Sequence, residues 1–300
     1  MRSQDKKLIE RGIKVGDTKI FEQDKVWSRY SNDKVNIGEE LAKVIRVLNK
    51  ALPLTFPITA LSIGSSNEPQ FRILETACRG GLYLLDIEKD ALEIVKERIA
   101  RQHTNHVFTV LSDFDKMLLN AAQARMFLKN RLHSKKINLI TLHHSLYYCN
   151  EGKWGLFFNN LYRYISAPVA AFHAVLMAPC SDDPCTTSWI YDHFVGKYFG
   201  CKNRQDLFKL KDQLQRETLF KKTQIFFKKN RVYFYVDDFE KFMSVIWMIM
   251  LYPNVHQYSL KEREEITEFV YKRLWIKKKP LVQVQDHMVI YKGIRFKGLI

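Results

Sequence analysis

The sequence predicts an α/β fold, with a mostly parallel seven-stranded sheet, helices on both faces, and a helical and hairpin region in the C-terminal part. Short apolar runs rich in β-branched residues alternate with longer helical patterns between residues 37 and 180. This alternation is typical of strand–helix–strand crossovers, which build a parallel sheet covered on both sides. The chain has 300 residues, of which 46% are hydrophobic, so it can form such a core and a substantial appendage.

The N-terminal segment, residues 1–36, shows only weak periodicity and carries Trp27 and Tyr30. We expect it to form an arm that packs on a larger body. From Ile37 to Leu48, apolar residues recur at helical spacing, which predicts a helix that leads to Pro53.

The first strand and the start of the next helix carry clear local signals. Residues 58–64 (ITALSIG) form an apolar run that stops at Gly64, as buried parallel strands often do. Ser65 and Glu68 then have the spacing of a capping box, and Pro69 fits only the first turn of a helix. The sequence therefore predicts a tight strand-to-helix turn at Gly64.

The alternation of strands and helices continues as far as Pro179. We expect strands at 82–87, 106–112, 137–144 and 169–178, and helices at 91–100, 116–132 and 154–165. Ligands of such sheets bind at the carboxyl ends of the strands. Polar residues directly after each strand are therefore the candidates for a site.

Beyond Pro179 the rhythm changes. Helical patterns occupy 186–219 and, as two helices broken near Pro253, 238–275. Residues 223–236 and 281–292 predict two hairpins, which turn at 229–230 and 286–287. The predicted organisation is an arm at 1–36, a ligand-binding core at 37–180, a mostly helical cap with hairpin strands at 181–280, and strands that complete the sheet at 281–300.

Bulk properties narrow the functional classes. Forty-eight basic residues against 32 acidic ones give a net charge of +16, which is compatible with a nucleic-acid partner, although lysines spread along the whole chain are also what a solvated surface contains. The N-terminus has no apolar signal core, the five cysteines form no C-x-x-C pair, and no apolar run is long enough for a membrane span. We expect a cytoplasmic protein without a membrane partner.

Polar residues follow the predicted strands in a regular series. Gly64 ends the first strand, and a glycine there allows a ligand to approach the backbone at a helix N-terminus, which favours a carboxylate or phosphate. Asp86 follows about 20 residues later, where an acid can accept hydrogen bonds from both ribose hydroxyls. Asp113 comes after the third strand, and His143 and His144 end the fourth. The series points to an adenosine ligand.

This order of signals resembles the class I S-adenosylmethionine-dependent methyltransferase family over about residues 37–180. The resemblance implies a Rossmann-like fold, S-adenosylmethionine as the methyl donor, and a division of the site into parts. The resemblance implies that the methionine end of the donor contacts Gly64, Ser65, Ser66 and Glu68. It implies that the ribose contacts Asp86 and Ile87, and that the adenine contacts Asp113 and Phe114. It further implies that the reacting methyl is bordered by His143, His144 and Tyr147, and that Tyr30 closes the pocket.

The first loop departs from the family's pattern. Ser62 stands in the place of an acid, and Ser66 and Glu68 replace the later glycines, so that only Gly64 remains. A pyrophosphate needs the second glycine for close approach to the backbone, whereas S-adenosylmethionine contains no phosphate. The loop therefore favours a phosphate-free ligand.

Each candidate also has a structural alternative. Asp86 and Asp113 are good helix caps, and Phe114 suits core packing. His143 and His144 are adjacent in a strand, so their rings point to opposite faces and cannot jointly bind a metal. Either a general base or a hydrogen-bonded structural histidine fits that position, and Tyr147 either stacks on substrate or covers the surface.

These observations predict a methyltransferase that acts on a small molecule held under the aromatic C-terminal cap. An RNA or protein methyltransferase is the second interpretation, supported by the net charge. The third, from another functional class, is a non-catalytic adenosine-binding module or interaction scaffold. We predict no metal.

Overall fold

The computed structural model of the chain describes residues 3–18, 23, 26–27, 29–30, 32–64, 70–251 and 257–296. Internal contacts divide the chain into two units, each made of discontinuous segments. The sheet unit comprises 37–176, 206–229 and 286–300, and the helical unit comprises 1–36, 177–205 and 230–285. The predicted division at residues 36, 180 and 280 remains a prediction.

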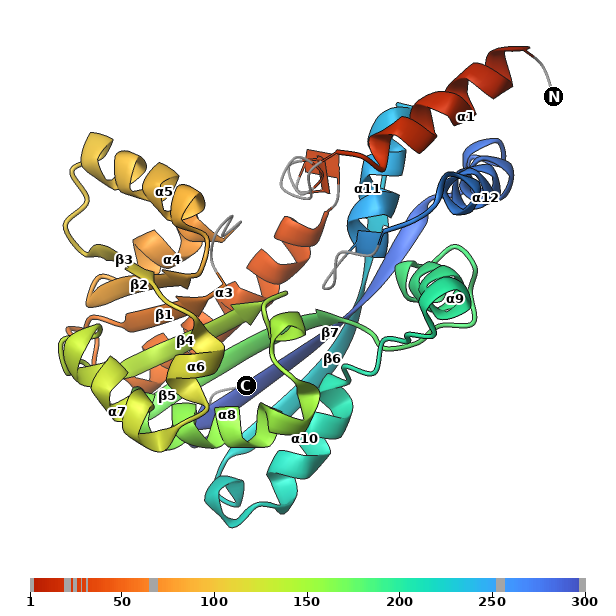
Figure 1. The fold of residues 1–300 in the computed structure, drawn as a ribbon. Coiled ribbons are helices and arrows are strands. Elements are labelled where there is room, and N and C mark those ends of the chain that lie inside the picture. The colour runs from red at the N-terminus through yellow and green to blue at the C-terminus, as the bar shows by residue number, and fades with distance from the viewer. Residues whose placement is uncertain are drawn as a thin grey trace. The chain divides into compact units, whose positions relative to one another are not determined.

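Seven strands form one sheet in the order β3-β2-β1-β4-β5-β7-β6. They are β1 (Thr59–Ile63), β2 (Gly81–Asp86), β3 (Val107–Leu111), β4 (Ile137–His143), β5 (Ser166–Met177), β6 (Gln224–Phe234) and β7 (Leu281–Lys292). The first five pair in parallel, whereas β7 points opposite to its neighbours β5 and β6 in Figure 1. The predicted mostly parallel, Rossmann-like α/β fold is confirmed.

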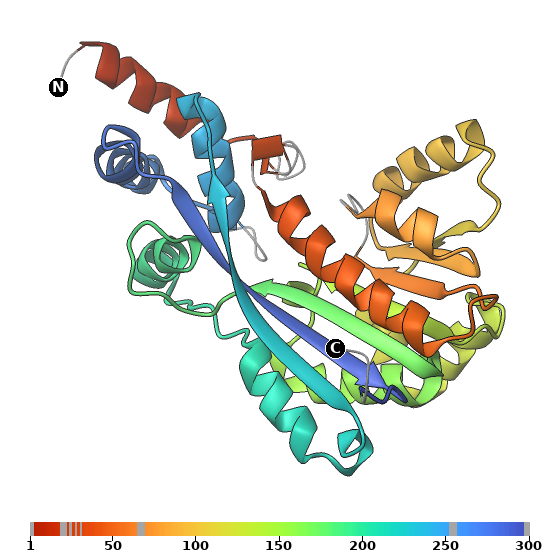
Figure 2. The same cartoon turned by 180° about the vertical axis from the view of Figure 1, so that it is seen from behind.

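Helices cover both faces of the sheet in the sheet unit. One layer contains α3 (Asp33–Ala51), α4 (Phe71–Ala77) and α5 (Lys89–Arg101), whose apolar residues pack with the buried side chains of β1 and β2. Figure 2 shows α3 lying along this face. The opposite layer contains α6 (Phe114–Leu118), α7 (Ala121–Asn130), α8 (Trp154–Asn160) and α10 (Leu207–Arg216). Because both faces are covered, every residue of β1, β2 and β4 is buried.

The helix predicted at 116–132 is two helices in the structure. Asn120 is the N-cap of α7, where its side chain accepts hydrogen bonds from the backbone N–H groups of Ala122 and Gln123. Asn competes in this way with helical backbone bonding. Helix α6 therefore ends at Leu118, and α7 begins at Ala121.

The two predicted hairpins are wrong, because each segment forms one continuous strand. Asp286 and His287, expected at a turn, are 1% and 2% exposed. The Asp286 carboxylate lies 3.8 Å from Nζ of Lys229, and His287 contacts the ring of His173 on the neighbouring strand β5. Partners on other strands thus override the local turn tendency of these residues.

The helical unit contains α1 (Ser3–Val15), α9 (Thr187–Phe199), α11 (Phe239–Leu251) and α12 (Leu260–Val270). The indole Nε1 of Trp247 in α11 donates to the carbonyl of Gly12 in α1 at 3.0 Å, so the predicted arm includes a packed helix. The predicted break near Pro253 lies outside the described residues. Within the described part of the chain, no helix is long and apolar enough to cross a membrane.

Candidate functional site

The carboxyl ends of β1 and β2 are aligned with each other by backbone hydrogen bonds. Gly64 donates its N–H to the carbonyl of Leu85 at 2.8 Å, and Ser112, after β3, donates to the carbonyl of Asp86 at 2.9 Å. The residues that follow these strands therefore lie at one edge of the sheet, where parallel sheets bind ligands.

Gly64 and Ser145 form a cradle at this edge. Gly64 has φ +71°, and a Cβ atom on it would lie 2.4 Å from Cβ of Ser145, in the loop after β4. Only glycine allows that approach with that backbone conformation. Ser145 is 2% exposed, and its Oγ has no hydrogen-bond partner among the described residues. A buried hydroxyl beside a glycine backbone is chemically able to bind a polar group at this point.

Asp86 brings a buried carboxylate to the same edge. It is 5% exposed, and its Oδ1 accepts a hydrogen bond from the N–H of Glu88 at 2.8 Å. This bond fixes the turn after β2, but the N-cap residue of α5 is Glu88, so Asp86 is not the helix cap of the alternative interpretation. Ile87, the next residue, is exposed. Both residues remain predicted ribose contacts.

Asp113 caps a helix at the end of β3. Its Oδ1 accepts hydrogen bonds from the N–H groups of Asp115 and Lys116, at 3.0 and 3.4 Å. Phe114 is buried, with its ring edge-on to Phe157 at 5.7 Å. The structural alternatives for both residues are therefore present in the fold, and their adenine contacts remain predictions.

His143 lies in a row of three buried histidines. Its Nε2 is 3.1 Å from Nδ1 of His173 on β5, and Nε2 of His173 is 3.2 Å from Nδ1 of His287 on β7. Burial, followed by the charges of the two neighbouring rings, holds the pKa of His173 well below its usual 6.5. We name these residues the histidine row. Of these three histidines, only His143 was indicated by the sequence pattern.

His144 and Tyr147 form a separate pair. His144 has φ +57° and turns away from the strand path, and its ring stacks on that of Tyr147 with centroids 6.0 Å apart and planes 8° apart. The Tyr147 hydroxyl lies 3.5 Å from Nδ1 of His144. The two adjacent histidines thus have different partners, and their catalytic roles remain predictions.

The other predicted site residues lie in the helical unit or outside the described residues. Ser65, Ser66 and Glu68 are outside the described residues. Tyr30 belongs to the helical unit, where its carbonyl accepts a hydrogen bond from the N–H of Tyr235 and its ring is 5.6 Å from Nζ of Lys241. Its predicted closing role remains a prediction.

The sequence patterns did not indicate Ser145, His173 or His287 as site residues, and all three are buried polar residues of the sheet unit. His173 stands inside an apolar strand segment and has no local signal, and His287 follows Asp286 where the sequence predicted a turn. Ser145 has a weak local signal, because it is the first small polar residue after the two histidines.

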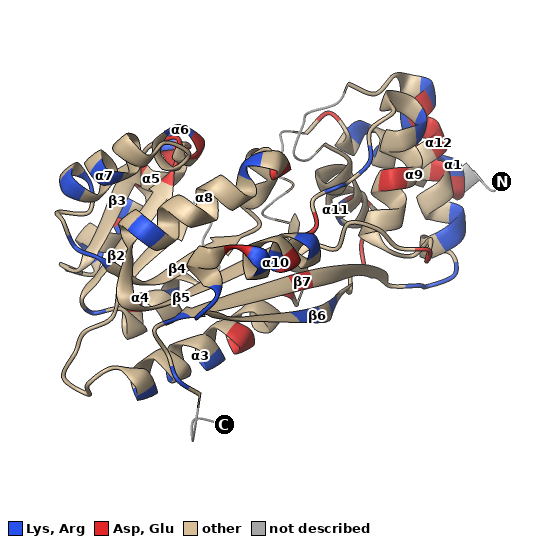
Figure 3. Ribbon diagram, turned by 90° about the horizontal axis from the view of Figure 1, so that it is seen from below, with Lys and Arg blue, Asp and Glu red and all other residues tan. Residues whose placement is uncertain are grey.

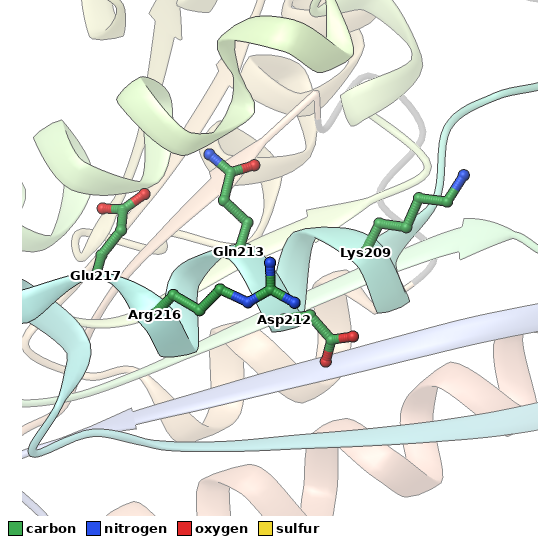
Figure 4. A pocket seen from close by; sticks show the side chains of 5 residues that line it. All are labelled: Lys209, Asp212, Gln213, Arg216 and Glu217. Carbon is green, nitrogen blue, oxygen red and sulfur yellow. The ribbon is translucent and has the colours of Figure 1, made fainter.

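The sheet unit also contains a shallow hollow of about 440 Å³ along α10. Its lining residues are Lys209, Asp212, Gln213, Arg216 and Glu217, and Figure 4 shows Gln213 and Glu217 pointing toward the neighbouring helix. Acids and bases alternate along this helix face, as on a solvated surface. No predicted site residue lines the hollow. In the described ranges, no group of three or more His, Cys, Asp or Glu residues could hold a metal ion.

Comparisons with known proteins concern the fold. No family model and no curated protein matches the sequence. The solved structures similar to the chain include the YcgJ protein from Bacillus subtilis, with 10% identity, a TM-score of 0.50 and coverage of 82% of this chain and 95% of that one. They also include BH2331 from Bacillus halodurans C-125 (11% identity, TM-score 0.48, 84% and 99% covered) and the plantazolicin methyltransferase BamL (13%, 0.46, 97% and 98%). The likeness to YcgJ shows that this chain has the same α/β fold.

Proposed function

We propose that the chain is a methyltransferase that binds S-adenosylmethionine at the carboxyl ends of β1, β2 and β4. The observation that carries the proposal is the cradle of Gly64 and Ser145 next to the buried carboxylate of Asp86. A glycine cradle suits close contact with the methionine part of the donor, and a buried acid one strand away suits a ribose. The residues present therefore fit this donor.

Each group has a stated task in this proposal. Bound S-adenosylmethionine supplies an activated methyl group, so the protein needs to position an acceptor in line with it, which can contribute about 7–11 kcal/mol to lowering the barrier. Asp86 binds and orients the ribose. His143 holds or accepts a proton where the acceptor carries one, which adds roughly 10² to 10⁴ in rate.

We propose a small organic molecule as the acceptor. The helical unit contains a hollow of about 430 Å³ whose lining includes Phe234, Phe242 and Trp275 together with Lys278 and Lys279. Apolar hollows of this size with a few polar groups are typical of small-molecule sites. The lining, which also includes Asp237, has the aromatic and charged groups that suit a small organic molecule.

Nucleic acid is the second candidate acceptor, because the net charge is +16. Figure 3 shows Lys and Arg on many elements, interspersed with Asp and Glu. Phosphate contacts make binding fall steeply with salt. Two results would favour this candidate over a small molecule. RNA binding should weaken steeply between about 50 and 200 mM salt, and binding of a preferred RNA should survive competition by RNA of unrelated sequence.

The test of the proposal is calorimetric titration of the full chain with S-adenosylmethionine and S-adenosylhomocysteine. We expect both to bind, and the Asp86→Asn variant to bind at least about tenfold more weakly, since a hydrogen bond to a charged group contributes about 1.5–3 kcal/mol. Asn keeps the acceptor for the Glu88 N–H, so folding should be unchanged.

The matched control is Asp90→Asn, which removes the same charge from an exposed residue of α5. It should leave donor affinity unchanged. Absence of binding heat with both ligands in the folded wild type would contradict the proposal. Donor labelled in the methyl group then distinguishes methyl transfer from transfer of the aminocarboxypropyl arm.

A further inference from the structure

The histidine row crosses three neighbouring strands of the sheet unit. His143 on β4, His173 on β5 and His287 on β7 are 9%, 0% and 2% exposed. Strand β5 pairs with β4, and β7 follows β5 in the sheet order. The centroids of the successive rings are 4.9 and 5.4 Å apart. The row therefore runs from the candidate site across the sheet toward the edge strand β6.

The distances leave room for one proton in each link of the row. The two nitrogen pairs are 3.1 and 3.2 Å apart, which is hydrogen-bond distance and requires one nitrogen of each pair to donate and the other to accept. A link in which both facing nitrogens are bare, or both carry a proton, cannot form the hydrogen bond.

His173 has to be neutral in this setting. It is fully buried, which disfavours its charged form, and a proton on either neighbouring ring, His143 or His287, would repel a second proton on it. A neutral imidazole has one N–H and one bare nitrogen. If the proton of His173 is on Nε2, then Nδ1 of His173 is bare and Nε2 of His143 must donate to it. If the proton of His173 is on Nδ1, then Nε2 of His143 must be bare and accept from it.

We propose that His173 and His287 are positioning residues that fix the tautomer of His143, so that the three imidazoles adopt one tautomer in common. In one state of the row all three rings carry the proton on Nε2, and Nδ1 of His143 is a base. In the other all three carry it on Nδ1. This role for His143 rests on the proposed function, whereas the coupling of the tautomers does not.

Neither a metal site nor simple packing accounts for the full geometry of the row. A metal site needs ligands arranged around one point, and no such group of three exists among the described residues. Simple packing explains burial but not two consecutive nitrogen contacts with the Nε2-to-Nδ1 order repeated.

The experiment is nitrogen NMR of the full chain labelled with ¹⁵N-histidine, in which long-range proton correlations identify the protonated nitrogen of each ring at neutral pH. We expect His143, His173 and His287 each to show one neutral tautomer, and the same tautomer in all three. A charged His173, or neighbouring rings in opposite tautomers, would overturn the proposal.

A variant at the far end tests the coupling. His287 lies on β7, two strands away from His143 on β4, yet His287→Phe should change the His143 nitrogen signals from one tautomer toward a mixture of two. His287→Gln, which retains a donor and an acceptor, is the conservative variant and should keep the wild-type signals. If the Phe variant does not fold, His287→Leu, which also removes both ring nitrogens, takes its place and should give the same change. The control is His133→Phe at an exposed histidine outside the row, and it should leave His143 unchanged. Unchanged His143 signals in the folded Phe variant would refute the coupling.

The failure of this proposal is distinguishable from that of the proposed function. An intact common tautomer without S-adenosylhomocysteine binding would leave the row standing and overturn the methyltransferase. Binding of S-adenosylhomocysteine with independent tautomers would do the reverse.

Discussion

At the scale of the residue, two glycines share a left-handed backbone but differ in surroundings. Gly64 has φ +71° and Gly200 has φ +66°. A Cβ on Gly64 would meet Ser145 at 2.4 Å, whereas nothing lies within 4 Å of one on Gly200. Comparing alanine substitutions at Gly64 and Gly200 therefore separates two effects on the free energy of unfolding: backbone strain, which both positions share, and filling of the cradle, which only Gly64 has.

We expect Gly200→Ala to lower the free energy of unfolding by about 1–2 kcal/mol, the cost of a left-handed alanine. Gly64→Ala should cost about 1–3 kcal/mol more, because Ser145 must move, and should weaken S-adenosylhomocysteine binding. Urea unfolding and calorimetry measure both effects. Adding Ser145→Gly to Gly64→Ala should restore the extra stability. Equal costs for the two alanine variants would be evidence against the cradle.

At the scale of the element, side-chain caps decide where the helices of the sheet unit begin. Asp113 caps α6 and Asn120 caps α7, each with two bonds to backbone N–H groups. The two caps are similar in chemistry, but only Asp113 follows a strand directly at the ligand-binding edge. Comparing them separates capping from ligand binding.

Replacing either cap by Ala should lower stability by about 1 kcal/mol, since an N-cap contributes that much. Asp113→Ala should also weaken S-adenosylhomocysteine binding, whereas Asn120→Ala should not. Asp113→Asn keeps the cap and should retain wild-type stability. These differences are measured by thermal unfolding and calorimetry. If neither alanine variant changes ligand affinity, Asp113 is a cap without an adenine contact.

At the scale of the whole molecule, one buried acid gives folding stability a pH dependence. Burial raises the pKa of Asp286 from 3.8 to about 6, while nearby Lys229 opposes this shift. The unfolded chain therefore loses this proton at lower pH than the folded chain. Between about pH 4 and 6 the folded state binds more protons, so stability falls as pH rises.

The pKa difference corresponds to about 3 kcal/mol, lost between about pH 4 and 6. We expect Asp286→Asn to be more stable than wild type at pH 7, by up to about that amount, and to lack this fall. Urea unfolding at several pH values measures it. Asp182→Asn, at an exposed acid, removes the same charge and should leave the fall in place. Identical pH profiles for Asp286→Asn and wild type would refute the prediction.

Local patterns in the sequence were enough to predict the first five strands, the parallel sheet and the edge where a ligand would bind. Buried parallel strands are continuous apolar runs, and the helices between them have their own period, so each element is visible without its neighbours. The series of Gly64, Asp86, Asp113 and His143 followed from the same patterns, because each residue directly follows or ends a strand.

The tertiary structure alone decided what depends on partners far away in the chain. Strands β6 and β7 are continuous because Asp286 and His287 contact Lys229 and His173, which no local window contains. Ser145 becomes part of the candidate site only where the loop after β4 meets Gly64. The sequence by itself determined the order of strands and helices in the fold. Strand pairing determined which buried polar groups came together, because pairing joins residues that are remote along the chain.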